Sequence, residues 1–134
     1  MPDKIVKSDA QWKAELPEDS FCILRQHATE AAFSGGHLDN HAAGTYQCRG
    51  CGNPLFGSQT KFDSGSGWPS YFRPLSDGAV AYTKDVSHGM ARIEVHCAAC
   101  DGHLGHVFDD GPPPTHKRYC INSASLTFVP EAAP

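Results

Sequence analysis

The sequence predicts a mainly β fold that begins with short helices and contains two metal-binding knuckles. Helical patterning ends before residue 30, and the rest of the chain consists of short segments in which apolar and polar residues alternate between turns. The length of 134 residues is that of one domain, which we place at residues 1–134. A chain of this size buries roughly two-thirds of its unfolded surface, so it can hold a core without disulfide bridges.

Two helices are expected within residues 8–27. Ser8 followed by Gln11 forms a capping box, and Trp12 and Leu16 lie four residues apart on one helical face. The first helix is therefore expected from about Ser8 to Leu16.

The second helix is expected over residues 17–27. Pro17 ends the first helix and fits the first turn of the next one, and Glu18 suits the positive end of that helix. Cys22 lies on this helix, where periodicity alone favours a packing role over a chemical one.

The remaining elements are strands joined by loops. Two alternating segments, 79–86 and 90–96, predict a hairpin joined by residues 87–89. A further alternating segment, residues 117–129, predicts one more strand. The expected loops are residues 29–44, 62–72 and 99–114, and the expected loose tail is residues 130–134.

Charge and hydropathy exclude several classes of partner. The formal net charge is −4, so no broad basic field attracts nucleic acid or anionic lipid. No apolar run approaches the roughly 18 residues of a membrane-spanning helix, and residues 1–7 lack the apolar core of a signal peptide. We therefore expect a cytoplasmic monomer that binds neither nucleic acid nor membrane.

Four of the six cysteines form two Cys-x-x-Cys pairs, Cys48 with Cys51 and Cys97 with Cys100. Two sulfurs at this spacing can chelate one ion, and neighbouring glycines let the chain turn towards it. We expect two hairpins to share one tetrahedral zinc ion, which is structural because four cysteines leave no open position. Two disulfides, or a redox-active pair, are the weaker alternatives.

Cys120 stands outside these pairs, on the expected strand 117–129. Residues two apart on a strand point to the same side, so Arg118, Cys120 and Asn122 share one face. A guanidinium next to a thiol favours the thiolate, which is the nucleophilic form. Asn122 adds a donor and an acceptor on the same side.

Two histidines and a carboxylate precede this strand. His103 and His106 titrate near neutrality and can give or take a proton, and Asp110 can orient an imidazole. With Cys120 they are candidates for nucleophilic thiol chemistry. The alternative interpretation is a small core cysteine with histidines on a surface loop. These residues alone favour the two interpretations about equally.

Several long motifs occur in a fixed order along the chain. They are Gly35 with Leu38 and Asp39, the Lys61–Ser70 run that contains Gly-Trp-Pro, the two Cys-x-x-Cys pairs, His103–Pro112 and Arg118–Leu126. Together they resemble the signature of the methionine sulfoxide reductase B family, over about Ser8 to Phe128. Motifs of this length and order are highly specific.

The resemblance implies a fold of two small antiparallel sheets that face each other, with the zinc at one end, away from the active site. It also implies a reductase that converts methionine-R-sulfoxide in proteins to methionine, a repair of oxidative damage. Cys120 would attack the sulfoxide sulfur, and His103 or His106 would protonate the departing oxygen. The matching Trp68 would form an apolar wall for the methyl group.

The chain departs from the family pattern at Ser66, where many members have a cysteine that resolves the sulfenic acid left on the nucleophile. A hydroxyl cannot form that disulfide. We expect either Cys22 or an external thiol such as thioredoxin to take this role, with a slight preference for Cys22. The alternative function is a zinc-stabilised β module that binds a ligand without turnover, which has no need of the Arg118, Cys120 and Asn122 face.

Overall fold

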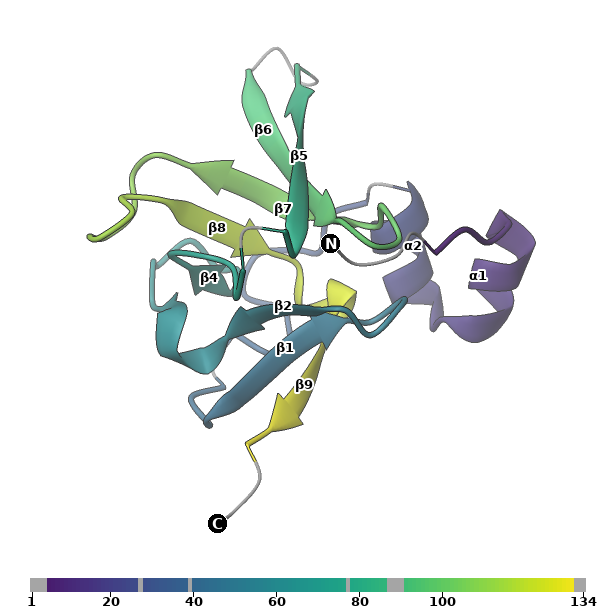
Figure 1. The fold of residues 1–134 in the computed structure, drawn as a ribbon, viewed down its shortest axis with the longest axis horizontal. Helices are drawn as coiled ribbons and strands as arrows, with labels where there is room; N and C mark the ends of the chain where they lie inside the picture. Colours follow the sequence, from purple (N-terminus) through teal and green to yellow (C-terminus); the bar gives the residue numbers. More distant parts are fainter. Residues whose placement is uncertain (1–4, 27, 39, 77, 87–90, 132–134) are drawn as a thin grey trace.

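The computed structural model describes residues 5–26, 28–38, 40–76, 78–86 and 91–131, and Figure 1 shows its fold. The two α-helices are α1 (Asp9–Glu15) and α2 (Glu18–Gln26), and the short 3-10 helices are η1 (Ser58–Thr60) and η3 (Ser123–Ser125). The strands are β1 (Gly44–Cys48), β2 (Pro54–Gly57), β3 (Lys61–Phe62), β4 (Ser70–Tyr71), β5 (Val80–Asp85), β6 (Arg92–Cys97), β7 (His103–Phe108), β8 (Arg118–Ile121) and β9 (Leu126–Pro130).

The strands form two antiparallel sheets, as the resemblance implied. One sheet has the order β2-β1-β9, and the other has the order β3-β4-β8-β7-β6-β5. β8 lies inside the larger sheet, where Cys120 is opposite Ser70 of β4 on one side and His106 of β7 on the other. The register of this sheet therefore brings three distant stretches of the chain together around one sulfur.

Aromatic side chains from both sheets meet in the core. The ring of Tyr71 from β4 stacks on Phe56 from β2 with 4.5 Å between centroids, and it meets Tyr46 from β1 edge-on at 5.4 Å. Tyr119 from β8 contacts Phe56 as well, at 5.7 Å. Because these contacts join one sheet to the other, the inner faces of the two sheets form a common core.

The helices confirm the predicted N-terminal segment. Ser8 caps α1, with its hydroxyl accepting from the Gln11 N–H while the Gln11 side chain accepts from the Ser8 N–H. Trp12 of α1 is buried. The helices lie side by side at one end of the molecule (Figure 1), and the predicted last residue, His27, lies outside the described residues.

Two predicted elements are wrong. Residues 103–108 were expected in a loop but form β7, which pairs with β6 on one side and β8 on the other. Two histidines and a glycine give this segment a weak local β signal, and the pairing partners on both sides override it. The expected strand 117–129 is broken at Asn122, where η3 carries the chain from the larger sheet into β9 of the smaller one.

The expected hairpin of residues 79–96 is confirmed in its strands, since Val80 of β5 is paired with Cys97 of β6 and Asp85 with Arg92. The predicted connection, residues 87–89, lies outside the described residues. Residues 62–72, which were expected in a loop, contain β4 and the last residue of β3. In the described part of the chain, no helix combines the length and the hydrophobicity of a membrane span.

Candidate active site and metal centre

The four paired cysteines converge on one point. Cys48 ends β1 and Cys51 lies in the turn that follows, and Cys97 ends β6 and Cys100 lies in the turn after it. The Sγ atoms of Cys48 and Cys100 are 3.6 Å apart, those of Cys51 and Cys97 are 3.5 Å apart, and all four lie within 4.8 Å of one another. A zinc ion with four bonds of 2.3 Å to sulfur places the sulfurs about 3.8 Å apart. The four cysteines therefore fit one tetrahedral zinc ion.

The electrostatics of the cluster agree with this fit. Hydrogen bonding to Cys100 raises the pKa of Cys48, whereas hydrogen bonding from Cys100 and Cys48 lowers the pKa of Cys97. Four sulfurs this close together disfavour carrying four negative charges on their own. A divalent cation between them would allow all four to be thiolates, which is the form that binds metal.

The helical N-terminus packs on the metal centre. Arg25 of α2 donates from Nη1 to the carbonyl of Cys100 at 2.7 Å, and its guanidinium lies over the Trp12 ring at 5.0 Å. A Cβ placed on Gly50, inside the first knuckle, would lie 3.2 Å from the Trp12 ring. The Ile5 N–H donates to the carbonyl of Ala99. The position of α1 and α2 therefore depends on the shape of the two knuckles.

Cys120 lies in a separate site on β8, and its strongest contact is with Arg118. The guanidinium donates from Nη1 to the sulfur at 2.9 Å, and it lies over the Phe108 ring at 4.5 Å. A hydrogen bond from a permanent cation stabilises a thiolate relative to a thiol. This geometry confirms that Arg118 and Cys120 share a face.

Asp110 holds the other side of the same guanidinium. Its two carboxylate oxygens accept from Arg118 Nε at 2.7 Å and from Nη2 at 3.1 Å. The hydrogen bonds from Arg118 lower the pKa of Asp110, and those to Asp110 raise the pKa of Arg118. The expectation that Asp110 orients a histidine is corrected here, because in the structure it orients the arginine.

Other carboxylates hold the two histidines. His103 Nδ1 is 2.9 Å from Glu94 Oε2, and His106 Nε2 is 2.8 Å from Asp85 Oδ2. The rings of His103 and His106 meet edge-on with 5.6 Å between centroids. Sequence reasoning missed Glu94 and Asp85, since their closeness to the histidines follows from the register of β6 with β7 on one side and with β5 on the other.

A cleft of about 270 Å³ opens over Cys120. His106 lines it, whereas His103 is buried behind, with 3 % of its surface exposed. Trp68 and Phe108 supply apolar walls. The full lining is Thr29, Trp68, Arg92, Gly105, His106, Phe108, Arg118, Cys120 and Asn122.

Asn122 borders the cleft, but both ends of its amide are already bonded to backbone. Its Oδ1 accepts from the Glu30 N–H at 3.0 Å, and its Nδ2 donates to the Leu104 carbonyl at 2.9 Å. The residue is 2 % exposed. In this structure the Asn122 Oδ1 and one Nδ2 hydrogen are engaged by backbone, which fixes the amide at the edge of the cleft.

Three serine hydroxyls form a network under the sulfur. The Oγ atoms of Ser66 and Ser70 lie 3.5 Å and 3.7 Å from Cys120 Sγ, and Ser64 Oγ joins them at 2.8 Å and 2.7 Å. The structure therefore places Ser66 against the Cys120 sulfur. Sequence reasoning missed Ser64 and Ser70, although Ser70 belongs to the Gly-Trp-Pro-Ser run that signals this loop.

Glu30, in the segment that follows α2, forms hydrogen bonds to three residues at or near the cleft. The Glu30 carbonyl accepts from the Trp68 indole at 3.0 Å, its N–H donates to Asn122, and its Oε1 accepts from the Ala124 N–H at 3.1 Å. This one residue therefore links Trp68, Asn122 and the η3 turn.

Cys22 is not brought to Cys120 in the described structure. It lines a different cavity of about 610 Å³, together with Asp19 of α2 and Glu30. Thr29 lines both that cavity and the Cys120 cleft, so the two adjoin at this residue. None of the six cysteines forms a disulfide in the structure.

Fold and site together define a mainly β protein with a four-cysteine cluster that can hold a metal ion and with a separate cysteine, Cys120, in a cleft. The sequence model of the SelR domain family matches residues 16–130, and the chain belongs to that family. Curated relatives named peptide methionine sulfoxide reductase MsrB cover nearly all of it. The relative from Thiobacillus denitrificans is 57% identical over 125 residues, which are 93% of this chain and 95% of the relative.

Two further relatives with that name agree. The protein from Bradyrhizobium diazoefficiens is 57% identical over 129 residues, covering 96% of this chain and 93% of the relative. The protein from Leptospira interrogans is 56% identical over 128 residues, covering 96% of this chain and 98% of the relative. The resemblance seen in the motifs is thereby confirmed.

Proposed function

We propose that this chain is a peptide-methionine (R)-S-oxide reductase, which reduces methionine-R-sulfoxide in proteins to methionine by thiol chemistry. The observation that carries the proposal is the 2.9 Å hydrogen bond from Arg118 Nη1 to Cys120 Sγ, at the base of a cleft lined by Trp68 and His106. The names of the relatives support the substrate class.

The reaction begins with the Cys120 thiolate attacking the sulfoxide sulfur. The oxygen, protonated by an imidazole, passes to the cysteine, so that methionine leaves as a thioether and Cys120 becomes a sulfenic acid. The substrate sulfur gains two electrons and the cysteine sulfur loses them. His106 is the donor that the geometry supports, because it lines the cleft while His103 contacts it from behind.

The walls of the cleft account for substrate recognition. Trp68 and Phe108 face the space above Cys120 and provide apolar surface for the methyl group. The indole is fixed by its hydrogen bond to the Glu30 carbonyl. Arg118 stabilises the thiolate, Asp110 keeps the guanidinium in place, and Asn122 positions β8 against the segment after α2.

The sulfenic acid must then be reduced. A thiol condenses with it to a disulfide and water, and a second thiol releases Cys120 as a thiolate. Thioredoxin or another thiol reductant would supply these electrons. The contacts support direct attack by an external thiol over resolution by Cys22, because the residue beside the sulfur is a serine, Ser66, and Cys22 lines a different cavity from Cys120.

The four knuckle cysteines, Cys48, Cys51, Cys97 and Cys100, would hold a structural zinc ion that takes no part in this reaction. Its role is to tie the turn after β1 to the turn after β6. Six cysteines without a disulfide suit a reducing compartment, and we infer a cytoplasmic location.

Reduction of a peptide methionine-R-sulfoxide with dithiothreitol tests the proposal. The wild-type protein should turn over, Cys120→Ser should lose activity by at least about a thousandfold, and Cys22→Ser should retain it with this small reductant. Turnover by the Cys120→Ser protein would refute the mechanism. No turnover by the wild type, together with a Cys120 that resists iodoacetamide at pH 7, would instead favour a binding module.

Mass spectrometry after one equivalent of substrate tests the resolving step. We expect a sulfenic acid on Cys120 that dimedone traps, with Cys22 still reduced. A disulfide between Cys22 and Cys120 would show that Cys22 resolves the intermediate, and it would require the segment that carries Thr29 to move.

A further inference from the structure

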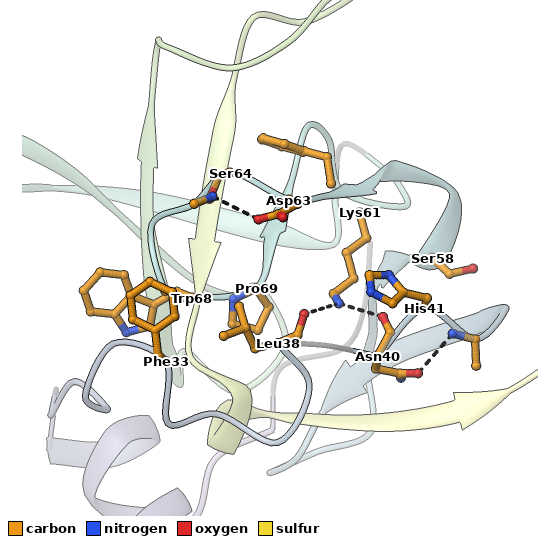
Figure 2. A pocket seen from close by; sticks show the side chains of 14 residues that line it. Phe33, Leu38, Asn40, His41, Ser58, Lys61, Asp63, Ser64, Trp68 and Pro69 are labelled. Atoms are coloured by element: carbon orange, nitrogen blue, oxygen red, sulfur yellow. Dashed lines mark hydrogen bonds between the residues drawn. The ribbon is translucent and has the colours of Figure 1, made fainter.

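A groove beside the Cys120 cleft is not used by the reaction described above (Figure 2). Its volume is about 590 Å³, against about 270 Å³ for the cleft. Trp68 lines both, so the groove begins where the cleft ends. Figure 2 shows the rings of Phe33 and Trp68 at one end, and Lys61 towards the other.

Phe33 is an unusual residue for this position. Its side chain is 71 % exposed, although it belongs to a large apolar type. Its backbone has a φ of 65°, in the left-handed region that bulky residues disfavour. The Phe33 N–H donates to the Gly67 carbonyl at 2.6 Å, and a Cβ on Gly67 would lie 2.9 Å from the Phe33 ring. The surrounding structure therefore holds this ring at the mouth of the groove.

The charged groups in the groove balance one another. Among the described residues that line the groove, Lys61 is the basic residue, apart from His41, and Asp63 is the acidic one. Lys61 Nζ donates to the carbonyls of Leu38 and Asn40 at 3.0 Å and 2.7 Å, which fixes the opposite wall. Asp63 Oδ1 accepts from the Gly65 N–H. The end of the groove that Phe33 and Trp68 line is apolar, so this end favours an uncharged, apolar side chain.

We propose that this groove binds residues next to the oxidised methionine in a polypeptide substrate and selects an apolar side chain there. The inference rests on the proposed reductase function. A methionine inside a polypeptide continues into neighbouring residues, and an extended chain advances about 3.3 Å per residue. Residues one to three positions from the methionine therefore reach a groove that shares Trp68 with the cleft. Phe33 supplies the exposed apolar surface that such a side chain would cover.

Steady-state kinetics on three substrates test the proposal, with dithiothreitol as the reductant. The substrates are N-acetyl-methionine-R-sulfoxide, a pentapeptide with Phe residues flanking methionine-R-sulfoxide, and the same peptide with Asp residues in those places. The wild type should prefer the Phe-flanked peptide over the Asp-flanked one by about tenfold in kcat/KM, mostly through KM. Phe33→Asn should lower kcat/KM for the Phe-flanked peptide about fivefold to tenfold relative to the acetylated amino acid.

Asn is chosen because it tolerates the left-handed backbone of residue 33, so the variant removes the ring without forcing the loop to change. Val6→Asn is the matched control, since Val6 is 90 % exposed and lies outside the groove, and it should leave all three rates unchanged. An equal loss on all three substrates, or a wild type without flank preference, would overturn the proposal. A defect seen with thioredoxin and absent with dithiothreitol would assign the groove to the reductant and overturn it too. Failure of the wild type to reduce any substrate would refute the reductase function itself.

Discussion

Arg118 donates a hydrogen bond to the sulfur of Cys120 at 2.9 Å, from two positions earlier on the same strand. The contact depends on the side-chain alternation of β8, and Asp110 fixes the guanidinium from the opposite side. A sulfur and a cation are thus held on one strand, and a neighbouring cation is one of the features that favour a reactive cysteine.

Replacing this arginine should slow the reaction of Cys120 with electrophiles. In Arg118→Ala the sulfur loses a charged donor, so the rate of iodoacetamide alkylation at pH 7 should fall about tenfold. Arg118→Lys should recover part of the rate, because lysine keeps the positive charge. It lacks the planar guanidinium, which donates to the sulfur and to Asp110 at the same time. Lys117→Ala, which alters the neighbouring exposed lysine paired with Asp109, is the control. Unchanged alkylation in Arg118→Ala would contradict the role given to the guanidinium.

The Asp110–Arg118 pair should add an acid-sensitive contribution to stability. Arg118 lowers the folded-state pKa of Asp110, so the stabilisation is present above the unfolded pKa of about 3.9 and is lost as the pH falls through the lower folded value. Urea midpoints should therefore drop less in Asp110→Asn than in the wild type between pH 5 and pH 2.5. Because the carboxylate is exposed, the difference should be small. Parallel curves for the two proteins would argue against the pair.

Removal of zinc should loosen the N-terminal helices before the rest of the fold. Trp12 packs on Gly50 and Arg25 bonds to Cys100, so both contacts depend on the knuckles. In a Trp68→Phe background, chelation should shift the remaining tryptophan fluorescence to the red and lower Tm by at least about 10 °C. A chromogenic chelator should count one zinc ion released per chain. Retention of the native spectrum without metal would contradict a structural role for the site.

A thiol at residue 66 should change how the intermediate is resolved. Ser66 Oγ lies 3.5 Å from Cys120 Sγ, so Ser66→Cys places a second sulfur next to the sulfenic acid. One equivalent of substrate should then yield a disulfide between residues 66 and 120, and dimedone labelling should fall by at least about tenfold. The measurement is made in a Cys22→Ser background, with Ser58→Cys as a control for a thiol placed elsewhere. Persistent dimedone labelling would mean that the two sulfurs do not meet.

Local patterns predicted much of this structure from sequence. The capping box at Ser8, the strands of the 79–96 hairpin and the two cysteine pairs each depend on residues within a few positions of one another. The shared face of Arg118 and Cys120 follows from strand alternation alone. These features are recovered because short-range geometry determines them.

The missing parts depend on strand register. Glu94 and Asp85 reach His103 and His106 only because β5, β6 and β7 pair in one particular alignment. Ser70 meets Cys120 for the same reason, across β4 and β8. Asp110 was expected to pair with a histidine that is close in sequence, but the fold pairs it with Arg118. Registers of this kind follow from the whole sheet and its core, which a single stretch of sequence does not specify.

The bonds made by Glu30 have a consequence for how this protein tolerates change in length. Surface loops normally accept insertions and deletions, because little depends on their exact spacing. Here, one residue more or fewer between α2 and Glu30 would shift Glu30 and break its hydrogen bonds to Trp68, Asn122 and Ala124 together. A connector that looks expendable therefore acts as a fixed spacer, and its residue count should be as constrained as that of a strand.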